Sequence, residues 1–195
     1  MTQNSAFLCY LYHTFSIVLK ATLLLPHRRI DMNDTTSLTP ELQYLLDRQD
    51  IQDTISRYSL GQDSHQGNDS NILDEWDETF KSDGRVDYRV AGGPVGSYRD
   101  LALWMRGGEG ASGSMSGFSN WQHMLSLPVV EVNGDHAVAR TDFFATHRGR
   151  ADQGANIHFN AAGAFHDELV RTKKGWRIAM RKLELYFGDA LAVTA

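Results

Sequence analysis

The feature that most constrains the fold is a series of long alternating segments in the second half of the chain. Four stretches alternate apolar and polar side chains, as strands with one buried face do: residues 123–132, 137–147, 157–171 and 176–187. Asn133-Gly134 is the strongest short hairpin signal, and Lys173-Lys174-Gly175 marks a second turn. The pattern predicts a meander of long, mostly antiparallel strands.

The residues before this series predict helices. Thr39-Pro40-Glu41 supplies an N-cap, a proline for the first helical turn and an acidic side chain near the helix dipole. Up to Gly61, apolar residues recur at helical spacing and predict one buried stripe: Leu42, Leu45, Leu46, Ile51, Ile55, Tyr58 and Leu60. The opposite face is expected to be solvated: Asp47, Arg48, Asp50 and Asp53.

Shorter elements are expected between the first helix and the long strands. The pattern favours a second helix over 72–80, a strand over 86–90 and a third helix over 98–105. About three helices followed by a curved antiparallel sheet make an α+β fold, in which the sheet wraps around the first helix and leaves a cavity. The glycine- and serine-rich residues 107–117 are interpreted as a mobile loop, either a plain connector or a lid over a pocket.

Residues 1–38 are expected to form a leader outside the fold, followed by one domain over 39–190. The apolar stretch from Ala6 to Leu25 is interrupted by His13 and Lys20, which makes it a marginal transmembrane helix. It also lacks the basic start and the cleavage site of a secretory signal. Two interpretations stay open: upstream sequence before a natural start at Met32, or a targeting or membrane-associated segment.

Charge and cysteine content exclude several classes of protein. The formal net charge is -5 and no run of Lys or Arg occurs, whereas a nucleic-acid surface needs a concentrated basic stripe. The single cysteine, Cys9, allows neither an intramolecular disulfide nor a thiolate metal cluster. No nucleic-acid or membrane partner is expected, and the chain is predicted to be cytoplasmic. No Rossmann fingerprint, P-loop or nucleophile elbow occurs, so no cofactor is expected.

Several strings resemble the SnoaL-like branch of the NTF2-like superfamily over about residues 42–189. They are Asp47-Arg48-Gln49-Asp50-Ile51, Gln122-His123-Met124, the segment 130–137, the segment 166–172 and Gly175-Trp176-Arg177-Ile178. The pattern is most similar to the scytalone dehydratase and bile-acid 7α-dehydratase type. The resemblance implies a cone in which the curved sheet holds the helices. The superfamily contains lyases, isomerases, cyclases and members with no catalytic activity. The resemblance therefore does not determine the function.

The resemblance implies an Asp-His pair at Asp63 and His123. Dehydratase and dehydrochlorinase members place an Asp at the end of the first helix and a His on the first long strand. A neutral imidazole removes a carbon-bound proton, and a buried carboxylate fixes its tautomer. Tyr58 would act as a general acid by the same analogy. The alternatives are a solvated Asp63, a satisfied core histidine at 123 and a core aromatic at 58.

Arg181 matches a pocket arginine that several relatives carry, and it could bind a departing anion or a substrate carboxylate. It alternates with apolar residues, so it needs a partner, either Asp142 or a ligand, and a purely structural ion pair within the chain is an equally open alternative. Asp142 is also a candidate pocket acid that would contact substrate. His158, Asn160 and His166 share one face of the third long strand and would contact substrate if that face points inward. No metal is expected there. Aromatic residues suited to a ring-shaped ligand, or to plain core packing, are Trp104, Phe118, Trp121, Phe143, Phe165 and Tyr186.

Taken together, these residues predict a cofactor-independent lyase of the dehydratase type. His123, oriented by Asp63, would abstract a proton while Tyr58 or Arg181 assists the loss of water, formaldehyde or another small group. The substrate would be a hydrophobic aromatic, polyketide or steroid-like molecule. An isomerase or cyclase with the same pair, or a non-catalytic ligand-binding domain, remains open. The resemblance also implies a homo-oligomer, a dimer or trimer.

Overall fold

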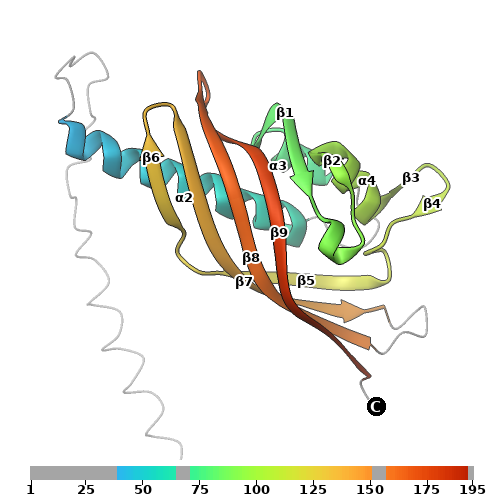
Figure 1. Cartoon of the computed structure of the whole chain (residues 1–195). Helices are drawn as coiled ribbons and strands as arrows, with labels where there is room; N and C mark the ends of the chain where they lie inside the picture. The colour runs from blue at the N-terminus through green and yellow to red at the C-terminus, as the bar shows by residue number, and fades with distance from the viewer. Residues whose placement is uncertain (1–38, 65–70, 151–156, 193–195) are drawn as a thin grey trace, which may run out of the picture. The chain divides into compact units, whose positions relative to one another are not determined.

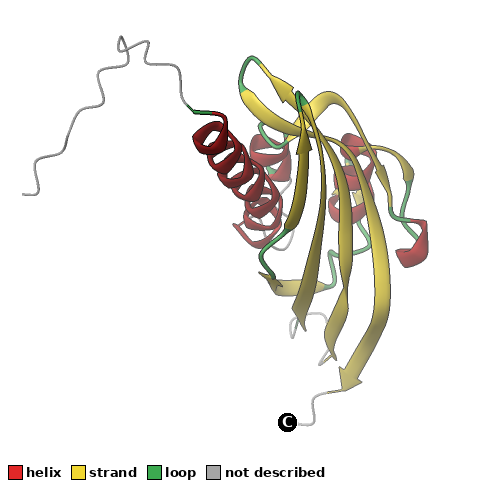
Figure 2. Ribbon diagram, turned by 60° about the vertical axis from the view of Figure 1, so that its left-hand side comes forward, coloured by secondary structure: helices red, strands yellow, loops and turns green. Residues whose placement is uncertain are grey.

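The computed structural model describes residues 39–64, 71–150 and 157–192, so the predicted leader lies outside the described residues. One curved sheet dominates this part of the chain (Figures 1 and 2). Its strands are β1 (Phe80–Asp87), β2 (Val95–Ser97), β5 (Phe118–Leu125), β6 (Val129–Asn133), β7 (His136–Gly149), β8 (Ile157–Thr172) and β9 (Gly175–Ala192). They follow the order β2-β1-β9-β8-β7-β5, with β6 also paired to β7. All pairs are antiparallel except β1 with β9.

The helices lie on one side of this sheet (Figure 2). They are α2 (Pro40–Ser64), α3 (Ile72–Trp76) and α4 (Tyr98–Arg106), with a 3-10 turn, η2 (Arg89–Ala91), and a small hairpin of β3 (Gly107–Gly108) and β4 (Ala111–Ser112). Ser97 starts α4 with a capping box, because its side chain accepts from the Asp100 backbone while the Asp100 carboxylate accepts from the Ser97 backbone. No helix in the described ranges is long and apolar enough to span a membrane.

The predicted α+β class and the curved, mostly antiparallel sheet are confirmed, with fewer helical residues than expected. The second helix ends at Trp76, and Phe80, which was predicted to close it, begins β1 instead. Residues 123–132 form parts of two strands, β5 and β6, that both pair with β7. Gly134 and Gly175 have φ angles of 61° and 91°, as the predicted turns require.

Helix α2 departs from its predicted amphipathic pattern in its first turns. Ile51, Ile55 and Tyr58 are fully buried as expected, but Leu45 is 61% exposed while Asp47 is only 5% exposed. Asp47 is buried because Arg171 binds both of its carboxylate oxygens, at 2.5 and 2.6 Å, and the indole of Trp176 donates to it at 3.2 Å. A buried carboxylate is tolerated when it is paired in this way.

Strand β7 shows how the sheet divides inside from outside. From Ala137 to Ala145 every odd-numbered residue is buried, and every even-numbered residue is exposed. Successive strand side chains point to opposite faces, so the odd set faces the helices and the even set forms the outer face. Three inward positions, Ala137, Ala139 and Ala145, carry small side chains. This leaves room between the sheet and the helices.

Candidate functional site

The interior of the sheet holds an apolar cavity of about 110 Å³. Helix α2, strands β5, β7, β8 and β9, and the segments around η2 and α4 all contribute side chains. Its lining includes Tyr58, Gln62, Tyr88, Trp104, Met105, Trp121, His123, Phe143, Ala145, His147, Phe159, Ala161, Phe165, Leu183 and Leu185. We call this space the interior cavity. Its volume is close to that of cavities that hold one benzene ring, about 150 Å³.

Asp63 and His123, predicted as a pair, are in direct contact beside this cavity. Asp63 lies in the last turn of α2, which packs against β5. Its Oδ1 lies 2.7 Å from His123 Nδ1, and its Oδ2 accepts the backbone N–H of His123 at 2.9 Å. A carboxylate only accepts, so Nδ1 carries the hydrogen and Nε2 is the nitrogen left for a ligand. Both side chains are largely buried, with 22% and 7% exposure.

Tyr58 is part of a hydrogen-bonded group of three residues on the cavity wall. Its hydroxyl lies 2.5 Å from the hydroxyl of Tyr88 and accepts from Gln62 Nε2 at 2.8 Å. Burial raises the pKa of Tyr58 to about 12 and that of Tyr88 well above 10. Both hydroxyls therefore keep their protons at neutral pH, and the pair can donate a hydrogen bond to a ligand.

His147 adds a second imidazole to the cavity, and the sequence interpretation missed it. Its Nδ1 donates to the carbonyl oxygen of Phe159 at 3.1 Å, so in the neutral ring Nε2 is an acceptor. The His147 and His123 ring centroids are 5.8 Å apart. Burial, with a smaller contribution from His123, lowers the pKa of His147 from 6.5 to about 4. At neutral pH His147 is therefore an uncharged acceptor.

This shift predicts a measurable loss of stability in acid. Because the pKa of His147 is depressed in the folded state, the unfolded chain binds its proton first as the pH falls from 6.5 to about 4. The contribution of His147 to the free energy of unfolding is therefore at its full value above pH 6.5, and it falls by about 3 kcal/mol as the pH drops across that window. Between pH 7 and pH 4, we expect the free energy of unfolding, measured by urea denaturation, to fall by about 3 kcal/mol less in His147→Gln than in wild type.

His136→Gln is the matched control, since His136 is exposed on the same strand. Its free energy of unfolding should follow the wild-type pH dependence. Parallel pH curves for wild type and His147→Gln would contradict the buried, neutral state of His147.

Of the alternatives for Arg181, the structure shows the intramolecular ion pair, and the partner is Asp167 and not Asp142. Arg181 makes two 2.7 Å hydrogen bonds to Asp167, and both side chains are fully buried. Its guanidinium lies 4.0 Å from the ring centroid of Tyr58 and 4.3 Å from that of Phe165. Asp167 and Arg181 face each other across β8 and β9, on the inner face. Arg181 therefore lies behind Tyr58 and does not line the interior cavity.

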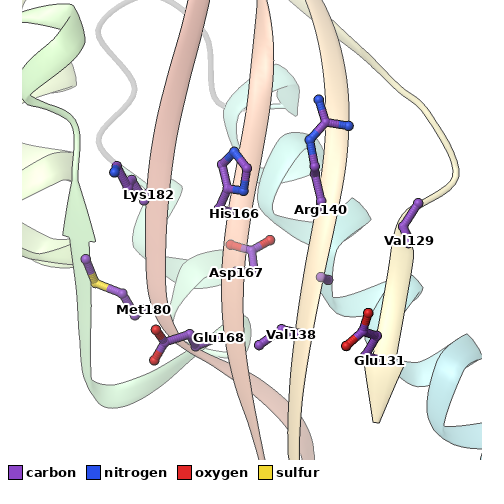
Figure 3. Close-up of a pocket in the computed structure, with 10 residues that line it drawn as sticks. Val129, Glu131, Val138, Arg140, His166, Asp167, Glu168, Met180 and Lys182 are labelled. Atoms are coloured by element: carbon purple, nitrogen blue, oxygen red, sulfur yellow. The ribbon is translucent and has the colours of Figure 1, made fainter.

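Four other predicted substrate contacts lie on the outer face, so the prediction that they face the interior is wrong. Asp142 forms an exposed ion pair with Arg140, and His166 contacts Glu184 at 2.7 Å. His158 and Asn160 lie opposite Arg148 and Thr146, which are also outward. Figure 3 shows His166 with Arg140 and Lys182 over a shallow outer groove of about 410 Å³, formed by strands β6 to β9. Strand parity decides this, because His158, Asn160 and His166 share the outward face of β8.

The predicted aromatic set is divided between the two faces. Trp104, Trp121, Phe143 and Phe165 line the interior cavity. Phe118 packs against His147 with a centroid distance of 5.5 Å, whereas Tyr186 is 52% exposed on the outer face.

The sequence interpretation missed Gln62, Tyr88 and His147. A signal for His147 was present, because it is four residues from Phe143 and so shares its face of the strand. Tyr88 had no such signal, because the expected strand 86–90 ends at Asp87 and the chain then turns into η2. Within the described ranges, no three His, Cys, Asp or Glu side chains are placed to bind a metal ion together.

Comparisons with known proteins identify the family and support the fold described above. The sequence profile of the SnoaL-like domain matches residues 43–182. Protein Rv2910c of Mycobacterium tuberculosis, which is uncharacterised, is 30% identical over 135 residues, covering 69% of this chain and 82% of that protein.

Two solved structures are similar in fold. One, provisionally assigned as a scytalone dehydratase of Novosphingobium aromaticivorans, has a TM-score of 0.60 and 21% identity, covering 80% of this chain and 94% of that chain. The other, an NTF2-like superfamily protein of Salmonella enterica, has a TM-score of 0.55 and 21% identity, covering 73% and 92%. At these identities the likeness shows the fold alone.

Proposed function

The chain belongs to the SnoaL-like domain family, and from this premise we propose that it is a cofactor-independent lyase that eliminates a small group from a hydrophobic substrate. The observation that carries the proposal is the Asp63–His123 contact at the wall of an apolar cavity. A histidine whose Nδ1 is held by a carboxylate offers Nε2 as a base. The neighbour assigned as a scytalone dehydratase supports the reaction class, since a dehydratase eliminates water.

The elimination follows from the positions of these groups. His123 Nε2 takes a proton from a substrate carbon, and the C–H electron pair forms the new double bond as the C–O bond of a neighbouring hydroxyl breaks. Asp63 stabilises the imidazolium that forms. The Tyr58–Tyr88 pair donates a hydrogen bond to the departing oxygen, which then receives the proton from His123 and leaves as water.

The size of the interior cavity narrows the substrate class. About 110 Å³ accommodates roughly one ring, so a single-ring aromatic alcohol suits it better than a steroid or an extended polyketide. The aromatic walls and the few polar groups, all from Gln62, the tyrosine pair and the two histidines, are typical of a site that binds a ring and orients one substituent.

A second candidate function is an isomerase or cyclase, and His147 is the observation that favours it. Its acceptor nitrogen belongs to the same cavity as His123, with the two rings 5.8 Å apart. Two imidazoles at one cavity could remove a proton from one carbon and return it at another, with no leaving group.

Product mass distinguishes the two reactions. We would incubate wild type and His123→Ala with a panel of single-ring hydroxylated compounds, without added metal, and analyse products by mass spectrometry. Loss of water or formaldehyde that is absent from His123→Ala supports the lyase, and a product of unchanged mass supports the isomerase. His166→Ala is the matched control, because His166 lies on the outer face. Bound but unaltered compounds across the panel would contradict both and indicate a binding domain.

The homo-oligomeric state, dimer or trimer, and the cytoplasmic location stay predictions. Sedimentation analysis of the purified chain would test the first.

A further inference from the structure

Three polar side chains on the wall of the interior cavity, Gln62, Tyr58 and Tyr88, are joined in series by hydrogen bonds. The Gln62 amide lies 2.8 Å from the Tyr58 hydroxyl, which lies 2.5 Å from the Tyr88 hydroxyl. All three residues are buried. Because a phenol hydroxyl has one hydrogen to donate, the direction of each bond decides which residue can donate to a ligand.

The amide of Gln62 fixes the direction of the first bond. Its Nε2 atom lies 2.8 Å from the Tyr58 oxygen and 3.5 Å from the sulfur of Met105. A thioether sulfur accepts hydrogen bonds and cannot donate them. With the amide reversed, its oxygen would face the Met105 sulfur, and two acceptors would oppose each other. Gln62 therefore donates to Tyr58.

The surroundings of Tyr58 fix the direction of the second bond. Side chains without a hydrogen-bond acceptor enclose its ring: Trp76, Phe80, Phe165 and Arg181. Among the residues that the structure describes, the partners of its hydroxyl are Gln62 and Tyr88. Since the Gln62 amide already donates, the Tyr88 oxygen is the acceptor within reach of the Tyr58 hydrogen.

The charge of Arg181 favours the same direction. Its guanidinium lies 4.0 Å from the ring centroid of Tyr58. A positive charge beside a phenol favours loss of its proton, which makes the hydroxyl a stronger donor. Accepting from Gln62 strengthens the Tyr58 hydroxyl further, because hydrogen bonds that run in one direction polarise one another. The series therefore runs from Gln62 through Tyr58 to Tyr88.

Tyr88 is the end of this series. Within the described part of the chain its hydroxyl is bonded to Tyr58, from which it accepts, so its own hydrogen is available to a ligand. Tyr88 is 3% exposed, whereas Tyr58 has no exposed surface. The two imidazoles of the cavity offer acceptor nitrogens, since their Nδ1 atoms are bonded to Asp63 and Phe159. A ligand oxygen that carries no hydrogen therefore finds a donor in Tyr88.

We propose that Gln62 is a positioning residue whose amide sets the direction of this series, so that Tyr88, and not Tyr58, donates the hydrogen bond to the substrate oxygen. This inference rests on the proposed function, because it assigns the contact with the departing oxygen to one tyrosine of the pair. Tyr88 keeps its proton throughout, since the departing group receives its proton from His123. Tyr58 acts through Tyr88, whose hydrogen it directs toward the cavity.

The test measures the binding of acetophenone and α-methylstyrene to the full chain by NMR titration. The two probes are nearly identical in shape, but the carbonyl oxygen of acetophenone accepts a hydrogen bond and the methylene group of α-methylstyrene does not. Neither probe has a hydroxyl group to lose, so the result does not depend on turnover. For each variant, the affinity for acetophenone is divided by the affinity for α-methylstyrene, and this ratio is compared with that of wild type.

In Tyr88→Phe we expect the ratio to fall about tenfold, as the loss of one hydrogen bond to the ligand implies. In Tyr58→Phe the Tyr88 hydroxyl keeps its hydrogen, so the ratio should stay within about twofold. Gln62→Met removes the amide at nearly constant shape and leaves Arg181 alone to favour the original direction, so the ratio should fall about threefold or more. The affinity for α-methylstyrene should stay within about twofold in all three variants, which shows that the cavity is intact.

Tyr186→Phe is the matched control, because Tyr186 lies exposed on the outer face, and it should keep the wild-type ratio. A ratio that falls in Tyr58→Phe but not in Tyr88→Phe would assign the contact to Tyr58 and overturn the inference. An unchanged ratio in Gln62→Met, or no measurable binding of acetophenone by wild type at millimolar concentration, would overturn it as well. If the ratio falls with Tyr88 and Gln62 while no hydroxylated compound is converted, the direction of the series stands and the proposed reaction is overturned.

Discussion

Replacing Asp63 by Asn will lower kcat of the elimination by about 10⁴-fold, because the substitution forces the wrong tautomer on His123. In wild type, Asp63 accepts two hydrogens, one from His123 Nδ1 at 2.7 Å and one from the His123 backbone at 2.9 Å. An amide has one acceptor and one donor. If its oxygen accepts the backbone hydrogen, its NH₂ faces Nδ1 and drives the ring hydrogen to Nε2, where a base is needed.

The opposite orientation of the amide does not restore the site. Its NH₂ would then face the backbone N–H of His123, leaving two donors against each other and a strand hydrogen unpaired, at a cost of about 1–3 kcal/mol. The measurement is single-turnover kinetics on whichever panel compound wild type converts, with thermal unfolding as a check on folding. Asp142→Asn is the control, because Asp142 lies on the outer face, and should keep wild-type kcat. A kcat for Asp63→Asn within threefold of wild type would refute the base role of His123.

Removing one partner of the buried Arg181–Asp167 pair will destabilise the fold by about 3–5 kcal/mol. Both side chains have no solvent exposure, and the pair is bidentate at 2.7 Å. Asp167 and the neighbouring tyrosines hold the pKa of Arg181 above its usual range despite its burial. Arg181→Met therefore leaves a carboxylate buried without its counterion. Equilibrium urea denaturation will show the loss as a lower midpoint.

The double variant Arg181→Met/Asp167→Leu separates the ion pair from simple packing. With both charges replaced by apolar groups, we expect most of the lost stability to return. Arg140→Met breaks the exposed pair with Asp142 and should cost much less stability than Arg181→Met, because exposed ion pairs contribute little. If Arg181→Met lost as little stability as Arg140→Met, the stabilising role of the buried pair would be contradicted.

The buried pair also changes the role assigned to Arg181. The sequence interpretation gave it a place in catalysis, whereas the structure places its guanidinium against the rings of Tyr58 and Phe165. Its effect on turnover would then pass through the position of Tyr58. Arg181 is a structural group that supports one side of the cavity.

Much of the fold could be predicted because the strands follow a simple local rule. Period-two alternation located β7, β8 and β9 to within a few residues, and Asn133-Gly134 located the turn between β6 and β7. Errors arose where local pattern and tertiary contacts disagree. Phe80 continues the apolar spacing of a helix, yet it pairs with Ile178 as the first residue of β1. The leucines at the start of α2 are apolar but exposed, whereas Asp47 is buried by Arg171 and Trp176.

The candidate site, too, could be predicted from the sequence only in part. The sequence by itself determined the α+β class, the long strands and, through resemblance, the Asp63–His123 pair. It could not determine which face of each strand points inward, because an alternating strand has two faces and a single-residue change of register exchanges them. The pairing of β8 with β9 sets the register between these strands and places Asp167 opposite Arg181. The alternation of side chains along β8 turns His158 outward. Only the tertiary structure decided which charged groups meet, since an ion pair depends on strands that are distant in sequence.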